Sequence, residues 1–543
     1  MPEVLNLSLS QPSNHVITHL YNNQESHLPY KKNAIVNYDN NVFLSSSRTS
    51  NGQVNYTPRA LIYDFQGGLG SLSKYEYHDP IGTFDHTVSN YQLISNTNHQ
   101  ILPKNQYQIN LDKGVSNDGD DDLLNVNNTN YWSDYNKLIY SSKSLNTLQN
   151  FKISSHTTSY GQHKNFKNLT FNNYKIGSEE FSQDLNHIDL QLDNFRYNLE
   201  KCDNFQGLNV LTQLNSGWGG FTNQFLISII DEYFNTTTAN NKHSVWIYGL
   251  HPYIDTSDSH PSKLIKTISQ IKTMIELHKN CSLLFPINMD EYSPNSLLNS
   301  DEFNHQSPWH ASAIPSMFIN SIWGINNQAS SESTSKSMSL IEDNLTRGYK
   351  NRTIVNEIKL HKVDDPANLS QINNLISNVD ISEYYYGNKA IPSETLQPLD
   401  LSMPKLLPST TKSMTKYFVK NYIIPQKHQK QLDEKLQGST EGDGVIKNVY
   451  KSRDITDILK NDTFPHRILS SNVKSFYSEF NINTDFKQDL KSYKQLISNV
   501  KLNLTDAMDI MEDKSELIED IDALIEEYTI DYELSDESDD DDL

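Results

Sequence analysis

A glycine-rich turn between two apolar runs constrains the fold of this chain more than any other feature. Residues 216–220 read SGWGG; they follow the apolar run 208–214 and precede a second one at 225–230. Nucleotide-binding folds place phosphate groups where a strand passes through glycines into a helix. The glycines admit close approach, and the helix N-terminus offers free N–H groups. We therefore expect helix, strand, turn and helix across residues 195–233.

Other apolar runs extend this pattern along the first half of the chain. Strand-like runs alternate with helical patterns, which favours an α/β domain with a mainly parallel sheet. The runs lie at residues 4–9, 60–65, 208–214 and 244–250. Residues 98–177 are instead rich in Asn, Ser, Tyr and Lys, so we expect an insertion with flexible parts there.

Three segments, in this order, resemble the tubulin superfamily. The N-terminal PEVLNLSLSQPSNH matches the first strand and loop of tubulins at Glu3, Gln11 and Asn14. The segment TPRALIYD, which ends at Asp64, is similar to a second tubulin motif, and the glycine turn lies between KCDNFQG and LIS, in the tubulin order. The exact sequences of three segments resemble the misato family of divergent tubulin-like proteins. They are YTPRALIYDFQGG, KCDNFQG and SGWGGF.

This resemblance implies a tubulin/FtsZ-like α/β fold with two domains. We expect an N-terminal domain of the nucleotide-binding type over residues 1–253, a second α/β domain over 254–505, and an acidic helix with a disordered tail over 506–543. The resemblance also implies a nucleotide site for GTP or GDP. Its residues would be Gln11, Asn14, Asp64, Ser216, Gly217, Gly219 and Gly220.

The same segments depart from the tubulin pattern in ways that argue against a GTPase. Ser10 stands where tubulins have glycine, and Pro12 replaces a cysteine and removes one backbone donor. Gln66 stands where tubulins carry a magnesium-associated carboxylate. Trp218 and Phe221 are bulky where a phosphate needs close backbone approach. We therefore expect a vestigial site without GTP hydrolysis or filament formation, and we expect that the protein is not an enzyme. Bound GTP or GDP stays an alternative.

Two side chains near the turn invite specific predictions. Trp218 is either a buried aromatic side chain that closes an empty pocket or an exposed anchor for a partner. Cys202, by its place in the tubulin-like motif, would pack beneath the glycine turn. The chain lacks Gly-X-Ser-X-Gly, Walker and His-Glu-X-X-His motifs, and its scattered histidines do not favour a metal site.

Composition favours a reducing compartment without membrane insertion. Only two of the 543 residues are cysteine, and no run approaches the roughly 18–20 apolar residues of a membrane span. The N-terminus resembles neither a secretory signal nor a mitochondrial transit peptide. Because the resemblance implies work at mitochondria, we expect the protein in the cytoplasm and, peripherally, on the cytosolic face of the mitochondrion.

The net charge of −22 is concentrated at the C-terminal end. Residues 506–543 hold 18 acidic residues and one lysine, so they carry −17 and the preceding 505 residues carry −5. A body without a basic stripe argues against direct binding of nucleic acid. Residues 485–500 and 517–528 both show apolar side chains at helical spacing, so we expect two amphipathic helices before the disordered acidic end.

The resemblance implies a factor required for partitioning of mitochondria and inheritance of mitochondrial DNA. Without hydrolysis it would act through protein partners, at the mitochondrial surface or in cytoskeletal or chaperonin machinery. Two alternatives stay open. A GTP-binding switch predicts a bound nucleotide, whereas a cofactor of the cytosolic chaperonin or of tubulin folding predicts co-purification with chaperonin subunits.

Overall fold

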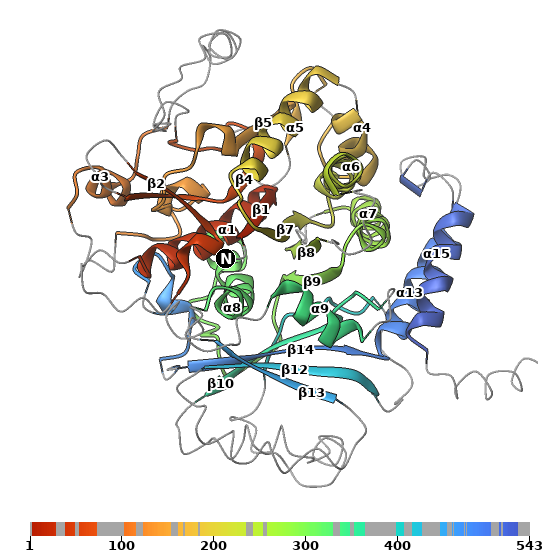
Figure 1. Ribbon diagram of the computed structural model, residues 1–543. Helices are drawn as coiled ribbons and strands as arrows, with labels where there is room; N and C mark the ends of the chain where they lie inside the picture. Colours follow the sequence, from red (N-terminus) through yellow and green to blue (C-terminus); the bar gives the residue numbers. More distant parts are fainter. Residues whose placement is uncertain are drawn as a thin grey trace, which may run out of the picture.

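The computed structural model contains two β-sheets, the first of which has helices on both sides (Figure 1). It describes residues 3–28, 38–48, 54–72, 102–115, 123–153, 161–166, 169–182, 185–234, 243–253, 258–328, 337–347, 352–363, 398–406, 415–425, 446–452, 459, 461–471, 473, 475–500, 510–511 and 514–529.

The first sheet has seven strands in the order β6-β5-β4-β1-β7-β8-β9. In sequence order they are β1 (Glu3–Leu9), β4 (Ala60–Gln66), β5 (Leu145–Lys152), β6 (Gln162–His163), β7 (Phe205–Gln213), β8 (Ser244–Pro252) and β9 (Leu283–Met289). Every neighbouring pair from β5 to β9 is parallel, and β6 pairs antiparallel with β5 at one edge. The predicted, mainly parallel α/β sheet is confirmed, with strands at all four predicted runs.

Two boundaries differ from the expectation. β9 pairs in parallel with β8, so the first sheet continues beyond residue 253, where we expected the first domain to end. Residues 98–177 are not simply an insertion, because β5 lies among them and pairs with β4. The buried residues of β5 are Leu145, Leu148 and Phe151. Their spacing of three hides the alternation that identifies a half-buried strand.

Helices cover both faces of the first sheet. On one side α1 (Gln11–Ser26) packs against α8 (Pro308–Asn326); on the other lie α4 (Tyr174–Ser182), α6 (Gly217–Ile229) and α7 (His260–Lys279) (Figure 1). The α8 helix is buried from Trp309 to Asn326 and also contacts the second sheet, so it lies at the centre of the molecule. No helix within the described ranges is both long and apolar enough to cross a membrane.

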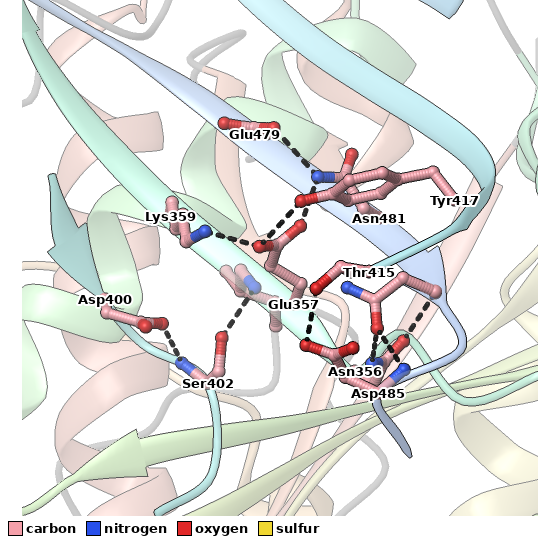
Figure 2. A network of polar contacts seen from close by, with 12 residues as sticks. Asn356, Glu357, Lys359, Asp400, Ser402, Thr415, Tyr417, Glu479, Asn481 and Asp485 are labelled. Atoms are coloured by element: carbon pink, nitrogen blue, oxygen red, sulfur yellow. Dashed lines mark hydrogen bonds and ion pairs between the residues drawn. The ribbon is translucent and has the colours of Figure 1, made fainter. Parts of the chain in front are cut away.

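The second sheet has five strands in the order β11-β10-β14-β12-β13. They are β10 (Glu357–Val363), β11 (Leu399–Asp400), β12 (Tyr417–Pro425), β13 (Ile446–Ser452) and β14 (Ser475–Asn483). One face of β10 and β14 carries a polar network in which Glu357 pairs with Lys359 and accepts a 2.6 Å hydrogen bond from Asn481 (Figure 2). Burial alone would raise the pKa of Glu479, but His361 at 2.8 Å and the charge of Lys359 hold that pKa below its usual range.

Two C-terminal helices complete the molecule. Both predicted amphipathic helices are confirmed, as α13 (Phe486–Asn499) and α15 (Lys514–Glu527), and they bury the apolar faces that the spacing predicted. The α15 helix packs against α13 and α7, so it belongs to the folded body rather than to a separate tail. The acidic end, residues 530–543, lies outside the described residues.

Smaller elements lie around this frame. They are η1 (Asn40–Val42), β2 (Leu44–Arg48), β3 (Val54–Pro58), α3 (Gln106–Asp112), η3 (Trp132–Tyr135), η4 (Ser142–Ser144), α5 (Leu185–Glu200), the π-helical turn η5 (Ile230–Phe234), α9 (Met338–Thr346) and η10 (His466–Ile468).

Candidate functional site

The predicted site residues gather at one edge of the first sheet. The strands β4, β1 and β7 are parallel neighbours, so their carboxyl ends meet at the same edge. Asp64 lies near the end of β4, Gln11 and Asn14 lie in the first turn of α1, and the glycine turn opens α6. Strand order reverses around β1, and open α/β sheets bind ligands at such a switch point. The structure therefore places these residues of α1, β4 and α6 at one edge of the sheet.

The N-terminus of α1 is capped by its own side chains. Ser10 Oγ accepts a hydrogen bond of 3.2 Å from the Ser13 N–H and lies 2.7 Å from Ser13 Oγ. Pro12 contributes no N–H, and the Asn14 N–H donates to the Ser10 carbonyl at 3.0 Å. Gln11, at the first helical position, is partly exposed. At the start of this helix the N–H groups of Ser13 and Asn14 are thus already used, and Pro12 has none.

Asn14 and Asp64 meet, but they bind each other. Asn14 Nδ2 donates to Asp64 Oδ2 at 2.9 Å and to the Tyr63 carbonyl at 3.0 Å. Asp64 also accepts hydrogen bonds from the Phe65 N–H at 2.8 Å and from Trp132 Nε1 at 3.2 Å. A carboxylate that accepts three hydrogen bonds from the protein is poorly placed to bind a cation or a nucleotide.

Burial shifts the titration of Asp64. Desolvation raises the pKa of this carboxyl group to about 6, although the hydrogen bonds from Asn14, Phe65 and Trp132 oppose the shift. Gly68 covers one side of the group so closely that a Cβ there would overlap the carboxylate. Within the described ranges, no three His, Cys, Asp or Glu side chains lie close enough together to hold a metal ion.

The N-terminus of α6 is also capped from within. Ser216 Oγ accepts a hydrogen bond of 3.3 Å from the Trp218 N–H. The Gly217 N–H donates to the carbonyl of Phe171 at 3.1 Å, and the Gly219 N–H donates to the Ser216 carbonyl at 3.2 Å. A backbone carbonyl from the segment before α4 therefore binds the N–H group that a phosphate oxygen would bind.

The glycines of this turn allow close approach, as predicted, but to protein rather than to phosphate. A Cβ at Gly220 would overlap the carbonyl oxygen of Tyr174 in α4, and one at Gly219 would overlap the side chain of Thr273 in α7. A Cβ at Gly217 would lie 2.8 Å from the ring of Phe171. The turn thus packs closely against α4 and α7, because only glycine leaves room for their atoms.

Trp218 is buried, with 1% of its surface exposed, so its interpretation as an exposed anchor was wrong, and the burial predicted by the alternative is confirmed. Its ring lies 5.0 Å from that of Phe65, 5.2 Å from that of Phe171 and 5.7 Å from that of Phe221, measured between centroids. This aromatic cluster fills the space beside the turn with apolar side chains, which do not solvate a phosphate.

Cys202 lies far from its predicted place. It precedes β7 at the amino end of the strand, whereas the glycine turn follows the carboxyl end. Arg59 Nη1 approaches Cys202 Sγ at 3.4 Å, and Arg59 also pairs with Glu3. Burial raises the pKa of the Cys202 thiol, and the nearby Arg59 opposes that shift only partly.

Two residues that close the site were missed by sequence reasoning. Trp132, which donates to Asp64, and Phe171, whose carbonyl caps α6, both lie in residues 98–177. The polar composition of that segment predicts an insertion, which hides both residues. The available signal was the presence of large aromatic residues in an otherwise polar segment, since such side chains are usually buried.

Comparisons with known proteins agree with this architecture. Residues 2–113 match a family model described as the Misato Segment II tubulin-like domain, and residues 122–324 match one described as a tubulin domain. Three relatives named Protein DML1 match this chain over nearly their whole length. The protein from Scheffersomyces stipitis is 47% identical over 100% of both chains, and that from Debaryomyces hansenii 41% over 99% of both. That from Candida albicans is 37% identical over 99% of this chain and 100% of the relative.

Proposed function

This chain belongs to the misato family of tubulin-like proteins, and we propose that it is a non-polymerising factor required for partitioning of mitochondria and inheritance of mitochondrial DNA. It acts through contacts with other proteins and not by catalysis. The family membership supports the cellular role, and the internal capping of both helices that face the switch point is the observation that supports action without catalysis.

Three oxygen atoms of the chain bind N–H groups at the starts of the two helices that face the switch point. They are Ser10 Oγ at α1 and, at α6, Ser216 Oγ and the carbonyl of Phe171. A nucleotide would have to break these bonds and leave the Phe171 carbonyl in an apolar cluster without a partner, which is unfavourable. This supports a pseudo-GTPase over a GTP-binding switch.

The environment of Asp64 supports the same conclusion for hydrolysis. GTP hydrolysis relies on a magnesium ion and on groups that position the attacking water. Asp64 is bound by Asn14 and Trp132, and Gln66 carries no charge at the position where tubulins have a carboxylate. The protein would therefore bind its partners in one state, without a nucleotide cycle.

We further propose a peripheral position on the cytosolic face of the mitochondrion. The excess of acidic residues in residues 506–543 favours a partner with a basic surface over nucleic acid. The effect on mitochondrial DNA would then be indirect, through the distribution of the organelle.

The first experiment measures nucleotide in the native protein. Purified protein is denatured, and the released small molecules are analysed for guanine nucleotides by chromatography and mass spectrometry. We expect an empty protein, with no saturable binding when GTP and magnesium are added back. Near-stoichiometric GTP or GDP would overturn the pseudo-GTPase proposal and favour the switch.

The second experiment tests the cellular role. The chain is depleted from its host cell, and the distribution of mitochondria and of their DNA between daughter cells is scored by microscopy. We expect uneven partitioning that the intact gene corrects. Carbonate should extract the protein from isolated mitochondria, and external protease should digest it. Normal partitioning, or full protease protection, would contradict the proposal. Co-purification with chaperonin subunits, together with normal partitioning, would favour the folding cofactor.

A further inference from the structure

The chain crosses from the first sheet to the second through residues 353–357, which we call the crossing segment. The Leu284 N–H of β9 donates to the Thr353 carbonyl, and the Val355 N–H donates to the Leu284 carbonyl, both at 2.9 Å. Glu357 then begins β10 of the second sheet. The crossing segment is therefore hydrogen-bonded to one sheet and continuous with the other.

The end of α15 is fastened to this segment by Tyr528. The Tyr528 hydroxyl accepts from the Ile354 N–H at 3.1 Å and donates to the Ile354 carbonyl at 3.0 Å, and both residues are fully buried. Its ring packs on that of Phe486 in α13, with centroids 5.1 Å apart. One hydroxyl thus binds both polar backbone groups of a single residue in the crossing segment.

Further contacts hold the same end of α15. Arg352 Nε donates to the Glu527 carbonyl at 2.7 Å, at a helix end where carbonyl groups lack intrahelical partners. His278 of α7 lies 2.7 Å from Thr353 Oγ1 and ties the crossing segment to the first sheet's helices. These contacts join α15, α7 and the crossing segment at one point.

The sides of α15 contact α7, which covers the first sheet, and α13. Asp520 pairs with Lys279 of α7 at 2.8 Å, and Asp522 pairs with Lys494 of α13 at 2.7 Å. Exposed ion pairs of this kind contribute little to stability. Burial of the apolar face therefore supplies most of the attachment, through Leu517, Ile521, Leu524 and Tyr528.

We propose that α15 is a clasp that fixes the angle between the two sheets, with Tyr528 holding the crossing segment. A rotation of the second sheet against the first must change backbone torsions in that segment. Such a change would separate the Ile354 N–H and carbonyl from the hydroxyl and leave buried polar groups unpaired. A partner that displaces α15 would therefore change the orientation of the second sheet.

The test is amide hydrogen exchange of the full chain at residue resolution, by mass spectrometry with electron-transfer fragmentation. Tyr528→Phe removes the hydroxyl and keeps the ring. We expect the amide of Ile354 to exchange at least about tenfold faster. The amides of Leu284 and Val355, whose hydrogen bonds join the crossing segment to β9, should also exchange faster. Tyr493→Phe in α13 is the matched control, because it removes a buried tyrosine hydroxyl and leaves both bonds to Ile354 in place.

A local effect would overturn the proposal. If Tyr528→Phe accelerates exchange at Ile354 and leaves Leu284 and Val355 unchanged, Tyr528 only caps the end of α15. Amides in β7, at the centre of the first sheet, report global stability and should keep their protection. If the β7 amides lose protection in Tyr528→Phe, a second variant, Leu524→Ala, tests the proposal. This variant weakens the attachment of α15 and keeps the Tyr528 hydroxyl. The same three amides should then exchange faster, and unchanged rates would overturn the clasp.

Discussion

At the scale of single residues, Ser10 holds a backbone conformation that glycine adopts more easily than any other residue. Its φ is 131°, in the region where side chains are strained. Its hydroxyl caps α1 through Ser13. The residue therefore has two opposing effects on stability, and two substitutions separate them.

Ser10→Gly should raise the free energy of unfolding by about 1 kcal/mol, because it removes the backbone strain. The loss of the cap costs little, since glycine is nearly as good as serine at this position of a helix. Ser10→Ala keeps the strain and loses the cap, so the free energy of unfolding should fall by about 1 kcal/mol. Urea unfolding of both variants measures the difference. Equal shifts in the two would show that the backbone at Ser10 is not strained.

The stability that Asp64 contributes should change with pH in the direction opposite to that of a salt-bridged carboxylate. Its folded pKa is about 6 against an ordinary value of 3.8, so its neutral form is favoured in the fold. The stability that it contributes is complete below about pH 3.8 and is lost as the pH rises through about 6. Asp64→Asn removes this titration. The variant's stability relative to the native protein should increase by up to about 3 kcal/mol between about pH 4 and 7. A constant difference would contradict the raised pKa.

At the scale of elements, the packing of α4 and α7 against α6 depends on glycine. The obstacle at Gly220 is the backbone of Tyr174, whereas the obstacle at Gly219 is the side chain of Thr273. The sequence predicts a turn that needs close approach. It does not predict what approaches, because Tyr174 and Thr273 come from other helices and make no pattern with the glycines.

Gly220→Ala and Gly219→Ala should both destabilise the protein by about 1–3 kcal/mol, as overpacking does. Adding Thr273→Ala should recover part of the loss in Gly219→Ala, because it shortens the obstructing side chain. It should recover nothing in Gly220→Ala, whose obstacle is backbone. Thermal and urea unfolding of the four variants would test this. Rescue of Gly220→Ala would mean that the two sites share one obstacle.

The packing of α1 against η3 and α8 buries His15 and His19 in their neutral form. Desolvation lowers the pKa of each to about 3, from 6.5. Their contribution to stability is complete above about pH 6.5 and is lost as the pH falls toward about 3, by about 1.4 kcal/mol per pH unit and residue. His19→Gln should flatten the pH dependence of urea unfolding between about pH 5 and 7.

At the scale of the whole molecule, four strands of the first sheet could be predicted from the sequence, whereas β5 and the closure of the site could not. Local apolar runs predict β1, β4, β7 and β8. Closure depends on Trp132 and Phe171, whose partners Asp64 and Gly217 lie in other elements. Only the folded chain brings these residues together.

Guanine nucleotide should leave the stability of the whole protein unchanged. A ligand at roughly a thousandfold above its Kd raises the free energy of unfolding by about 4 kcal/mol. With both helix N-termini capped from within, we expect no change in the melting temperature with GTP and magnesium. A rise that saturates with GTP would contradict the capped site. ATP in equal amount is the control for general ionic effects.

The capping of the two helices also bears on what nucleotide binding at this site would require. At α1 the backbone of Ser10 has a conformation that glycine adopts readily, so substitutions of side chains alone, at Ser10 and Pro12, would make this loop tubulin-like. At α6 the Phe171 carbonyl and the backbone of α4 occupy the turn, and no single substitution removes a backbone. Nucleotide binding would therefore require only changes of side chains at α1, but a new backbone arrangement between α4 and α6.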